Sequence, residues 1–381
     1  MRNECYVEVD TKQIKTNVEN IIKRYPGYQY FIAVVKGNAY GHGFGVIKPM
    51  IEAGANYFAV STLEEALAVR SLCDLPIMLL QPIALEDLKI ASDHKIDITV
   101  SDIDYYKEVA KMDLALSIQL KLETGMNRLG LDKIEDVDYV INDLKKHPNL
   151  YLKGIFTHLA TEGLLDSCWD DQVKEFEHLT SNIDLTKIDM VHLYSTQSLV
   201  YHPKLSYANG FRVGILMFGI CPRKRSYHGF VGMLKKLKHE NTKKKYHISK
   251  PNDDFNVDVK TCFKLKSPVI QIRDVKAGEG VGYGLTYRFS KDAKIAVAPI
   301  GYMDGLNLNS NGLKVKINDK LYPIVGFMNM KMITILVDQD VKVNDEVEVY
   351  GHDIRYSSDY CRVTPHFLFT VVPERIKRIY R

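Results

Sequence analysis

The sequence feature that most constrains the fold is the alternation of short β-prone runs with longer helical stretches over the first two-thirds of the chain. Eight such runs can be recognised, and amphipathic segments separate them. In one of these segments, Thr62 and Glu65 have the spacing of a capping box at a helix start. Eight β/α units within about 220 residues favour a TIM barrel over an open doubly wound sheet. The predicted strands are Phe31–Lys36, Tyr57–Val60, Pro76–Leu80, Ile96–Val100, Ser117–Leu122, Gly154–Thr157, Met190–Leu193 and Phe211–Val213.

The sequence changes in character from about Phe230. Residues 223–250 hold ten lysines and arginines against one acid, Glu240. Such a stretch serves as a basic docking patch or as a solvated, partly mobile linker or insertion, and we favour the second interpretation. Beyond it, β-rich runs are separated by glycine, asparagine and aspartate, which is typical of an all-β domain. We therefore predict a barrel over 10–230, a basic linker or insertion over 231–250, and a C-terminal β domain over 251–381 that also includes the N-terminal strand 4–9.

Composition excludes several classes of protein. The chain has 381 residues, of which 46% are hydrophobic and 26% charged, with a net charge of +4 that is too small to argue for a nucleic-acid partner. No apolar run reaches the ~18 residues of a membrane span, and the first ten residues lack the apolar stretch of a secretory signal. The six cysteines form no CxxC pair and no metal-ligand spacing. We expect a cytoplasmic protein with reduced thiols, no metal and no membrane segment.

The strongest local signal for chemistry is the segment Val34–Gly43, in which Lys36 ends the first barrel strand and a glycine-punctuated loop follows. The C-terminal ends of barrel strands carry the active sites of TIM barrels. A lysine there is partly desolvated, which lowers its pKa and leaves an amine able to form a Schiff base. From chemistry alone, a salt-bridged structural lysine fits this position about as well as a catalytic one.

The same segment closely resembles the lysine motif of the alanine racemase family. The members of this family are fold-type III enzymes that use pyridoxal 5'-phosphate (PLP). The resemblance recurs in order along nearly the whole chain. Its further segments are Leu120–Gly130, Gly154–Ala160, Phe211–Gly214, Val281–Tyr287 and Gly301–Gly305. The resemblance implies a barrel followed by a β domain, PLP as cofactor, and a homodimer.

The resemblance also implies a role for individual residues around the cofactor. Lys36 matches the lysine that binds PLP covalently, and His158 matches an imidazole that lies against the cofactor ring. Arg212 matches an arginine that hydrogen-bonds the pyridine nitrogen. Because arginine only donates hydrogen bonds and stays charged, the nitrogen remains unprotonated and the substrate carbanion is short-lived, which suits racemisation. The residues implied around the phosphate are Tyr40, Thr196, Gly214 and Ile215.

Racemisation requires an acid or base on each face of the substrate carbon. Lys36 would serve one face, and Tyr283 resembles the tyrosine that serves the other face from the partner subunit. Arg128 and Met330 match positions that contact the substrate carboxylate. Lys121 matches a lysine that is often carbamylated in this family.

Two stretches depart from the family pattern. Asn329-Met330-Lys331 carries a base where the family often has an acid, and Glu374 falls where a tyrosine often sits. These changes leave the substrate open. The resulting prediction is a PLP-dependent racemase of L- and D-alanine that supplies cell-wall precursors. The alternatives are a serine or broad-specificity racemase, a fold-type III decarboxylase, and a non-catalytic PLP-binding protein built on the same barrel.

Overall fold

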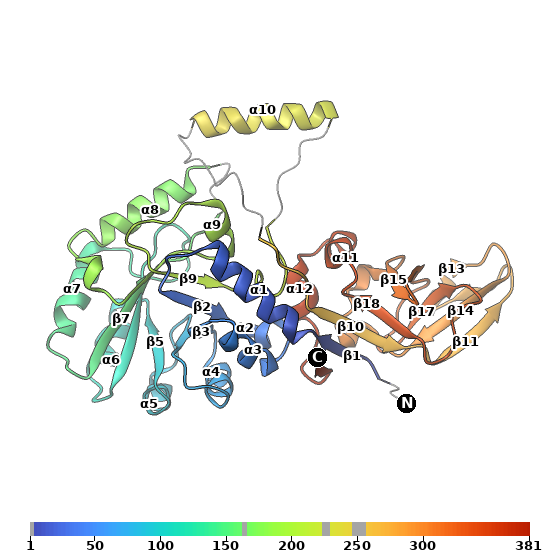
Figure 1. Cartoon of the computed structure of the whole chain (residues 1–381), viewed down its shortest axis with the longest axis horizontal. Coiled ribbons are helices and arrows are strands. Elements are labelled where there is room, and N and C mark those ends of the chain that lie inside the picture. Colours follow the sequence, from blue (N-terminus) through green and yellow to red (C-terminus); the bar gives the residue numbers. More distant parts are fainter. Residues whose placement is uncertain (1–3, 162–165, 223–228, 246–256) are drawn as a thin grey trace.

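The computed structural model describes residues 4–161, 166–222, 229–245 and 257–381. Figure 1 shows two bodies side by side, a β/α barrel built from the first part of the chain and a strand-rich domain built from the last part. The N-terminal strand lies with the second body, and one helix, α10, stands apart from both. This arrangement confirms the predicted fold class.

The barrel is a sheet of eight parallel strands in the order β8-β7-β6-β5-β4-β3-β2-β9. A parallel bridge between Tyr194 and Phe211 brings β8 next to β9 and closes the ring. All eight predicted strands are present, and two of their boundaries shift notably. The first ends at Val34, before Lys36. The sixth begins at Leu150, because residues 151–152, which are exposed or half-buried, also pair in the sheet before its buried end. The strands are β2 Tyr30–Val34, β3 Tyr57–Val60, β4 Ile77–Leu79, β5 Ile96–Val100, β6 Leu116–Lys121, β7 Leu150–Phe156, β8 Met190–His192 and β9 Gly210–Val213.

Helices follow the strands and cover the outside of the barrel (Figure 1). Helix α4 has the predicted capping box, in which Thr62 accepts a hydrogen bond from the backbone of Glu65. Helix α1 is capped in a similar way by Asp10, whose side chain accepts from the Gln13 backbone. The barrel helices are α1 Thr11–Arg24, α3 Ile47–Glu52, α4 Leu63–Arg70, α5 Leu88–Asp93, α6 Ile103–Ala110, α7 Ile134–Leu144, α8 Cys168–Leu179 and α9 Thr196–Tyr201.

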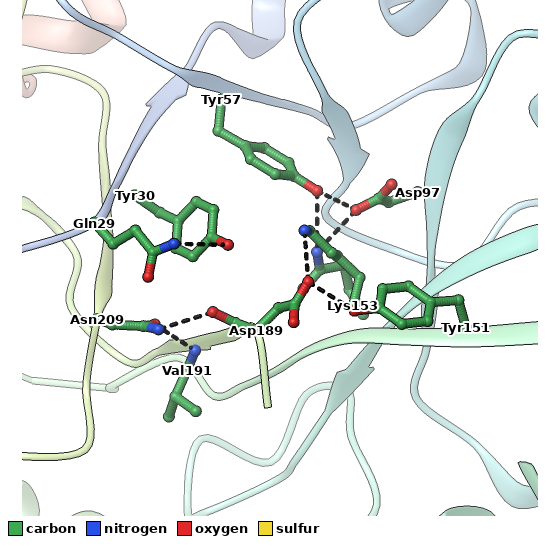
Figure 2. A network of polar contacts seen from close by, with 10 residues as sticks. Gln29, Tyr30, Tyr57, Asp97, Tyr151, Lys153, Asp189, Val191 and Asn209 are labelled. Carbon is green, nitrogen blue, oxygen red and sulfur yellow. Dashed lines mark hydrogen bonds and ion pairs between the residues drawn. The ribbon is translucent and has the colours of Figure 1, made fainter. Parts of the chain in front are cut away.

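Polar side chains fill the N-terminal end of the barrel, as Figure 2 shows. Tyr57, at the start of β3, donates to the buried Asp97 near the start of β5. Lys153 of β7 pairs with Asp189 at 2.9 Å, and Tyr151 donates to the same carboxylate at 2.7 Å. This end of the barrel is therefore closed by satisfied polar groups, which leaves the opposite end for a ligand site.

The C-terminal domain combines a six-stranded sheet, in the order β16-β15-β18-β10-β1-β19, with a three-stranded sheet, β11-β14-β17. Strand β1 pairs antiparallel with β10 and parallel with β19, so the N-terminal strand belongs to this domain. The domain also has two helices that the sequence analysis did not predict, α11 Ile354–Cys361 and α12 Pro365–Thr370. Its strands are β1 Tyr6–Val9, β10 Phe263–Pro268, β11 Gln271–Val275, β12 Gly280–Val281, β13 Tyr287–Arg288, β14 Ala293–Ala298, β15 Lys314–Ile317, β16 Lys320–Pro323, β17 Ile333–Val337, β18 Glu346–Tyr350 and β19 Lys377–Tyr380.

Part of the basic segment, which lies between the barrel and the C-terminal domain in the sequence, forms helix α10, Gly229–Lys245. The remaining residues of that segment, 223–228 and 246–250, lie outside the described part of the chain. Across the described ranges, no helix combines the length and the apolar character that crossing a bilayer demands.

Candidate active site

A cavity of about 780 Å³ opens at the C-terminal end of the barrel. Much of its wall is made by residues at or just after the ends of the strands, as expected for a TIM barrel. Nine of the eleven site residues predicted from the sequence line it. They are Lys36, Tyr40, Lys121, Arg128, His158, Thr196, Arg212, Gly214 and Ile215.

Lys36 begins a tight left-handed turn, α2 Lys36–Tyr40. Four consecutive residues there have positive φ, between 51° for Asn38 and 63° for Gly37. Left-handed backbone costs L-residues about 1–2 kcal/mol each, so the turn needs support from its surroundings. The Glu65 carboxylate supplies some of it by accepting hydrogen bonds from the backbone of Gly37 and Asn38. Glu65 therefore caps α4 and also holds the loop of Lys36, a second role that the sequence analysis missed.

The loop of Lys36 also contacts the C-terminal domain. Gly41 has a φ of 79°, and a Cβ added there would lie 2.1 Å from the carbonyl oxygen of Phe369 in α12. Only glycine fits this close approach. The position of the lysine is therefore set jointly by the barrel and by α12.

The amines in the cavity have lowered pKa values. Burial, followed by the positive charge of Arg128, lowers the pKa of Lys36. Burial, followed by the charges of Arg212 and Arg128, lowers the pKa of Lys121 to about 8. Both amines therefore lose a proton more easily than a lysine in water, as required of a nucleophilic or basic amine.

Arg212 of β9 is buried and fixed by several acceptors. One terminal nitrogen donates to Nδ1 of His192 at 2.6 Å, and the other donates to the carbonyl oxygen of Thr157 at 2.7 Å. Additional bonds run to the carbonyl oxygens of His192 and Leu193. Among the contacts of the described residues, Nε of Arg212 is the nitrogen without a partner. This donor is available to an acceptor atom of a ligand.

A chain of buried side chains continues from Arg212 through the barrel. Because arginine only donates, Nδ1 of His192 accepts, and the proton of the neutral ring is assigned to Nε2. Nε2 then donates to Gln119 at 3.1 Å, and the Gln119 amide donates to Asp97 at 2.9 Å. Burial beside Arg212 lowers the pKa of His192 well below its ordinary value, which keeps the ring neutral. The chain links the cavity to the polar network of Figure 2.

His158 follows β7 and lies in the cavity wall near Arg212, with Nδ1 3.5 Å from a guanidinium nitrogen. Burial and then the charge of Arg212 lower the pKa of His158 to about 3. The imidazole is therefore neutral at physiological pH and can pack against an aromatic ring without adding charge.

The cavity carries a large excess of positive charge. Five lysine and arginine side chains line it, against one acid, Asp359. Among the described residues, Lys36, Lys121, Arg128 and Arg212 make no salt bridge with a carboxylate. Buried charges are normally paired, so this cluster is suited to an anionic ligand such as a phosphate or a carboxylate.

The geometry beside Tyr40 fits a phosphate. A Cβ added to Gly214 would lie 2.5 Å from the Tyr40 hydroxyl, so the phenol takes its place in the cavity wall because position 214 has no side chain. Backbone groups at 214 and 215 border the same cavity as the Thr196 side chain. Together with the excess of cations, these donors fit the phosphate of PLP, and Lys36 provides the amine that PLP requires.

The other two predicted residues, Tyr283 and Met330, do not line the cavity. They lie in the C-terminal domain, where Tyr283 is 73% exposed and Met330 is also exposed. Close backbone contacts connect the segments that carry them, since Gly282 abuts Phe327 and Gly301 abuts Met330. The exposed apolar residues of these segments, which we call the C-domain patch, are Tyr283, Leu285, Tyr302, Met303, Phe327, Met330 and Met332.

Helices α11 and α12 contribute cavity residues that the sequence analysis missed, among them Arg355 and His366. The expectation of an all-β domain left no place for them. Glu374, which falls at a family tyrosine position, is exposed and is absent from the cavity wall. Lys331, the base at a position where an acid is frequent, pairs with the buried Asp304 at 2.6 Å.

Comparison with known proteins decides the family. The family model for the alanine racemase N-terminal domain matches residues 9–222, and the model for the alanine racemase C-terminal domain matches residues 262–380. The chain belongs to the alanine racemase family. The alanine racemase of Streptococcus mutans is 32% identical over 351 residues, covering 91% of this chain and 86% of that protein.

Solved structures of the alanine racemase family agree with this assignment. The alanine racemase of E. faecalis superimposes with a TM-score of 0.86 at 25% identity, covering 100% of this chain and 98% of the other. The histidine racemase of Leuconostoc mesenteroides gives a TM-score of 0.82 at 23% identity, covering 100% of this chain and 98% of the other. The second likeness concerns the fold alone. The predicted family is thus confirmed.

Proposed function

We propose that the chain is a PLP-dependent racemase that interconverts L-alanine and D-alanine. The observation that carries this proposal is the cavity itself, in which Lys36 lies among unpaired cations at the C-terminal end of the barrel. The alanine racemases that match along nearly the whole chain support alanine as the substrate. The reaction supplies D-alanine for cell-wall precursors. The six cysteines are scattered and form no CxxC pair, which favours a reducing, cytoplasmic location.

The residues present would hold PLP as follows. Lys36 would bind the aldehyde carbon, His158 would pack against the ring, and the phosphate would be held by Tyr40, Thr196 and the backbone at 214 and 215. The Nε donor of Arg212 would bind the pyridine nitrogen. When bound, PLP makes the α-proton of an amino acid more acidic by delocalising the electron pair left behind. Arg212 keeps the pyridine nitrogen unprotonated, which limits that delocalisation and favours prompt return of the proton.

Two residues of the chain would move the proton. Burial lowers the pKa of Lys36, so its amine is more often in the neutral form that can take a proton from one face of the substrate carbon. Tyr283 donates or accepts on the other face, and it comes from a second copy of the chain. The exposure of Tyr283 within the C-domain patch supports a homodimer, because an apolar patch of this kind marks an interface. In this dimer each C-domain patch covers the cavity of the partner.

The substrate carboxylate would be bound by Arg128, with the backbone N–H of Met330 from the partner. The loop of Arg128 is shaped by Glu123, which accepts from the backbone of Gly125 at 2.6 Å and of Arg128 at 3.0 Å. Lys121 is carbamylated in this proposal. In carbamylation the neutral amine adds to CO2 and releases a proton. The pKa of about 8 makes the neutral amine accessible, and the negative charge of the carbamate turns repulsion from Arg128 into attraction.

The test is a racemisation assay with the purified protein and PLP. A panel of L-amino acids is offered, and the D-product is measured by chiral chromatography, with alanine expected to react fastest. Borohydride should fix the cofactor irreversibly, and peptide mass analysis should find it on Lys36. Attachment to another lysine, or the absence of D-alanine, would refute the proposal. The Lys36→Ala variant provides the inactive control.

A further inference from the structure

Helix α10 has no counterpart in the regions that define the family. The two family models match residues 9–222 and 262–380, and α10 spans Gly229–Lys245 between them. In Figure 1 the helix stands away from both the barrel and the C-terminal domain. It is therefore not explained by the racemase fold or by the cavity.

One side of α10 carries an apolar stripe. Phe230, Met233, Leu234 and Leu237 recur at the spacing of a single helix face. All four are exposed, at 71%, 52%, 49% and 54% respectively. An apolar stripe on a helix normally packs against a core, and these four side chains reach none within the described chain. The stripe is thus suited to an apolar partner outside the chain.

The rest of α10 is strongly basic. The helix holds six lysines and one acid, Glu240, and it has no arginine. Among the described side chains, Lys235, Lys236 and Lys238 are exposed around the stripe, and Lys244 and Lys245 are exposed at the C-terminal end. The stripe occupies the first half of the helix, and lysines dominate the second half. The partner must therefore offer negative charge beside an apolar layer.

We propose that α10 binds the surface of an anionic lipid bilayer. The helix lies in the interface, with Phe230, Met233, Leu234 and Leu237 at the boundary of the acyl chains and the lysines among the headgroups. Long lysine stems can cover apolar surface while their amines reach the phosphates. The barrel and the C-terminal domain then remain in the water layer.

Two features favour lipid over other anionic partners. A nucleic acid would engage the lysines and leave the four apolar side chains in water. An acidic protein groove would be recognised better by arginine, whose planar fork pairs with carboxylates in a bidentate manner, whereas α10 holds lysine alone. A bilayer rich in anionic lipid satisfies the stripe and the charges together. This inference does not depend on the proposed reaction.

The test uses the full chain loaded with PLP and vesicles of two compositions. One contains phosphatidylcholine alone, and the other contains equal parts of phosphatidylcholine and phosphatidylglycerol. We expect flotation with the anionic vesicles only, weakened by salt. The triple variant Lys235→Gln, Lys236→Gln, Lys238→Gln should bind about a hundredfold more weakly, since each lysine near an anionic surface is worth about fivefold.

The apolar stripe is tested separately. The variant Leu234→Glu, Leu237→Glu should lose vesicle binding and retain racemase activity and the circular dichroism of the folded protein. The matched control replaces two exposed leucines elsewhere, Leu72→Glu and Leu321→Glu, and should still bind. In a Phe230→Trp variant, emission should shift to the blue on addition of anionic vesicles, against the constant background of the buried Trp169.

Several results would overturn the proposal. The first is the absence of flotation with anionic vesicles at low salt. The second is unchanged vesicle binding of Leu234→Glu, Leu237→Glu, which would place the binding surface elsewhere on the chain. The third is a change in oligomeric state of that variant in light scattering, which would mean that a second copy of the chain covers the stripe.

Discussion

If the active site is shared between two chains, defects in two different chains can complement each other. Lys36 lines the cavity of the barrel, whereas Tyr283 is exposed in the C-domain patch of the same chain and does not reach that cavity. Co-expression of Lys36→Ala chains with Tyr283→Phe chains places the two defects in one dimer. A mixed dimer then contains one site with both defects and one site with neither.

The expected activity follows from random pairing. Roughly half of the dimers are mixed, and each has one intact site of two, so roughly a quarter of the wild-type rate should return. If Tyr283 served the barrel of its own chain, no dimer would contain an intact site and the mixture would stay inactive. The rate is measured as D-alanine formed, and affinity tags on the two chains confirm that mixed dimers are present.

A reciprocal mixture makes the result decisive. Chains that carry both Lys36→Ala and Tyr283→Phe are co-expressed with wild-type chains. With shared sites, both sites of the mixed dimer are damaged and roughly a quarter of the activity remains, from wild-type dimers. With unshared sites, roughly half remains. A Tyr139→Phe change on α7, at another exposed tyrosine, serves as the control and should leave the activity unchanged. No activity in the first mixture, together with one-half of the wild-type activity in the reciprocal mixture, would refute the shared site.

Three further predictions concern buried charges. Replacing Arg212 by Glu favours a protonated pyridine nitrogen, so racemisation should fall by orders of magnitude while new long-wavelength absorbance appears with substrate; normal activity and an unchanged spectrum would place Arg212 elsewhere. Burial raises the pKa of Asp97 from 3.8 to about 6. As the pH rises through this range, the free energy of unfolding of the wild type should fall by about 3 kcal/mol relative to that of Asp97→Asn, measured by urea unfolding at both pH limits. Lys331→Met and Arg375→Met should each lower the free energy of unfolding only a little, because the other cation still pairs with buried Asp304. The double variant should lower it by about 3–5 kcal/mol. Small, additive losses of stability in thermal unfolding would contradict this.

Much of the barrel could be predicted from the sequence because its signals are local. Strand runs and strand ends follow from apolar periodicity, and Lys36 and Arg212 stand at such ends within recognisable segments. The capping box of Thr62 and Glu65 is also local. The second role of Glu65, on the loop of Lys36, depends on two elements that meet only in the folded barrel.

The remaining features depend on partners far apart in the sequence. Gln119 and His192 stand in β-prone runs where a polar residue suggests exposure, yet both are buried because the barrel interior links them to Arg212. Lys331 pairs with Asp304 of another segment, and no local sequence pattern predicts this ion pair. Helices α11 and α12 lie in a domain whose strands dominate the sequence pattern. Their contribution to the cavity could therefore not be predicted from the sequence.

The place of β1 in the C-terminal sheet has a consequence for how the protein is made. Val7 pairs with Leu265 of β10 and with Arg378 of β19, so a strand that leaves the ribosome early has partners that leave it late. During synthesis of the whole barrel, its apolar residues have no sheet to join. Closing such a long loop is slow, and unpaired strand edges promote aggregation. A stalled nascent chain would therefore expose β1 as an unpaired, aggregation-prone strand. A chaperone that shields this segment during translation should raise the yield of folded enzyme.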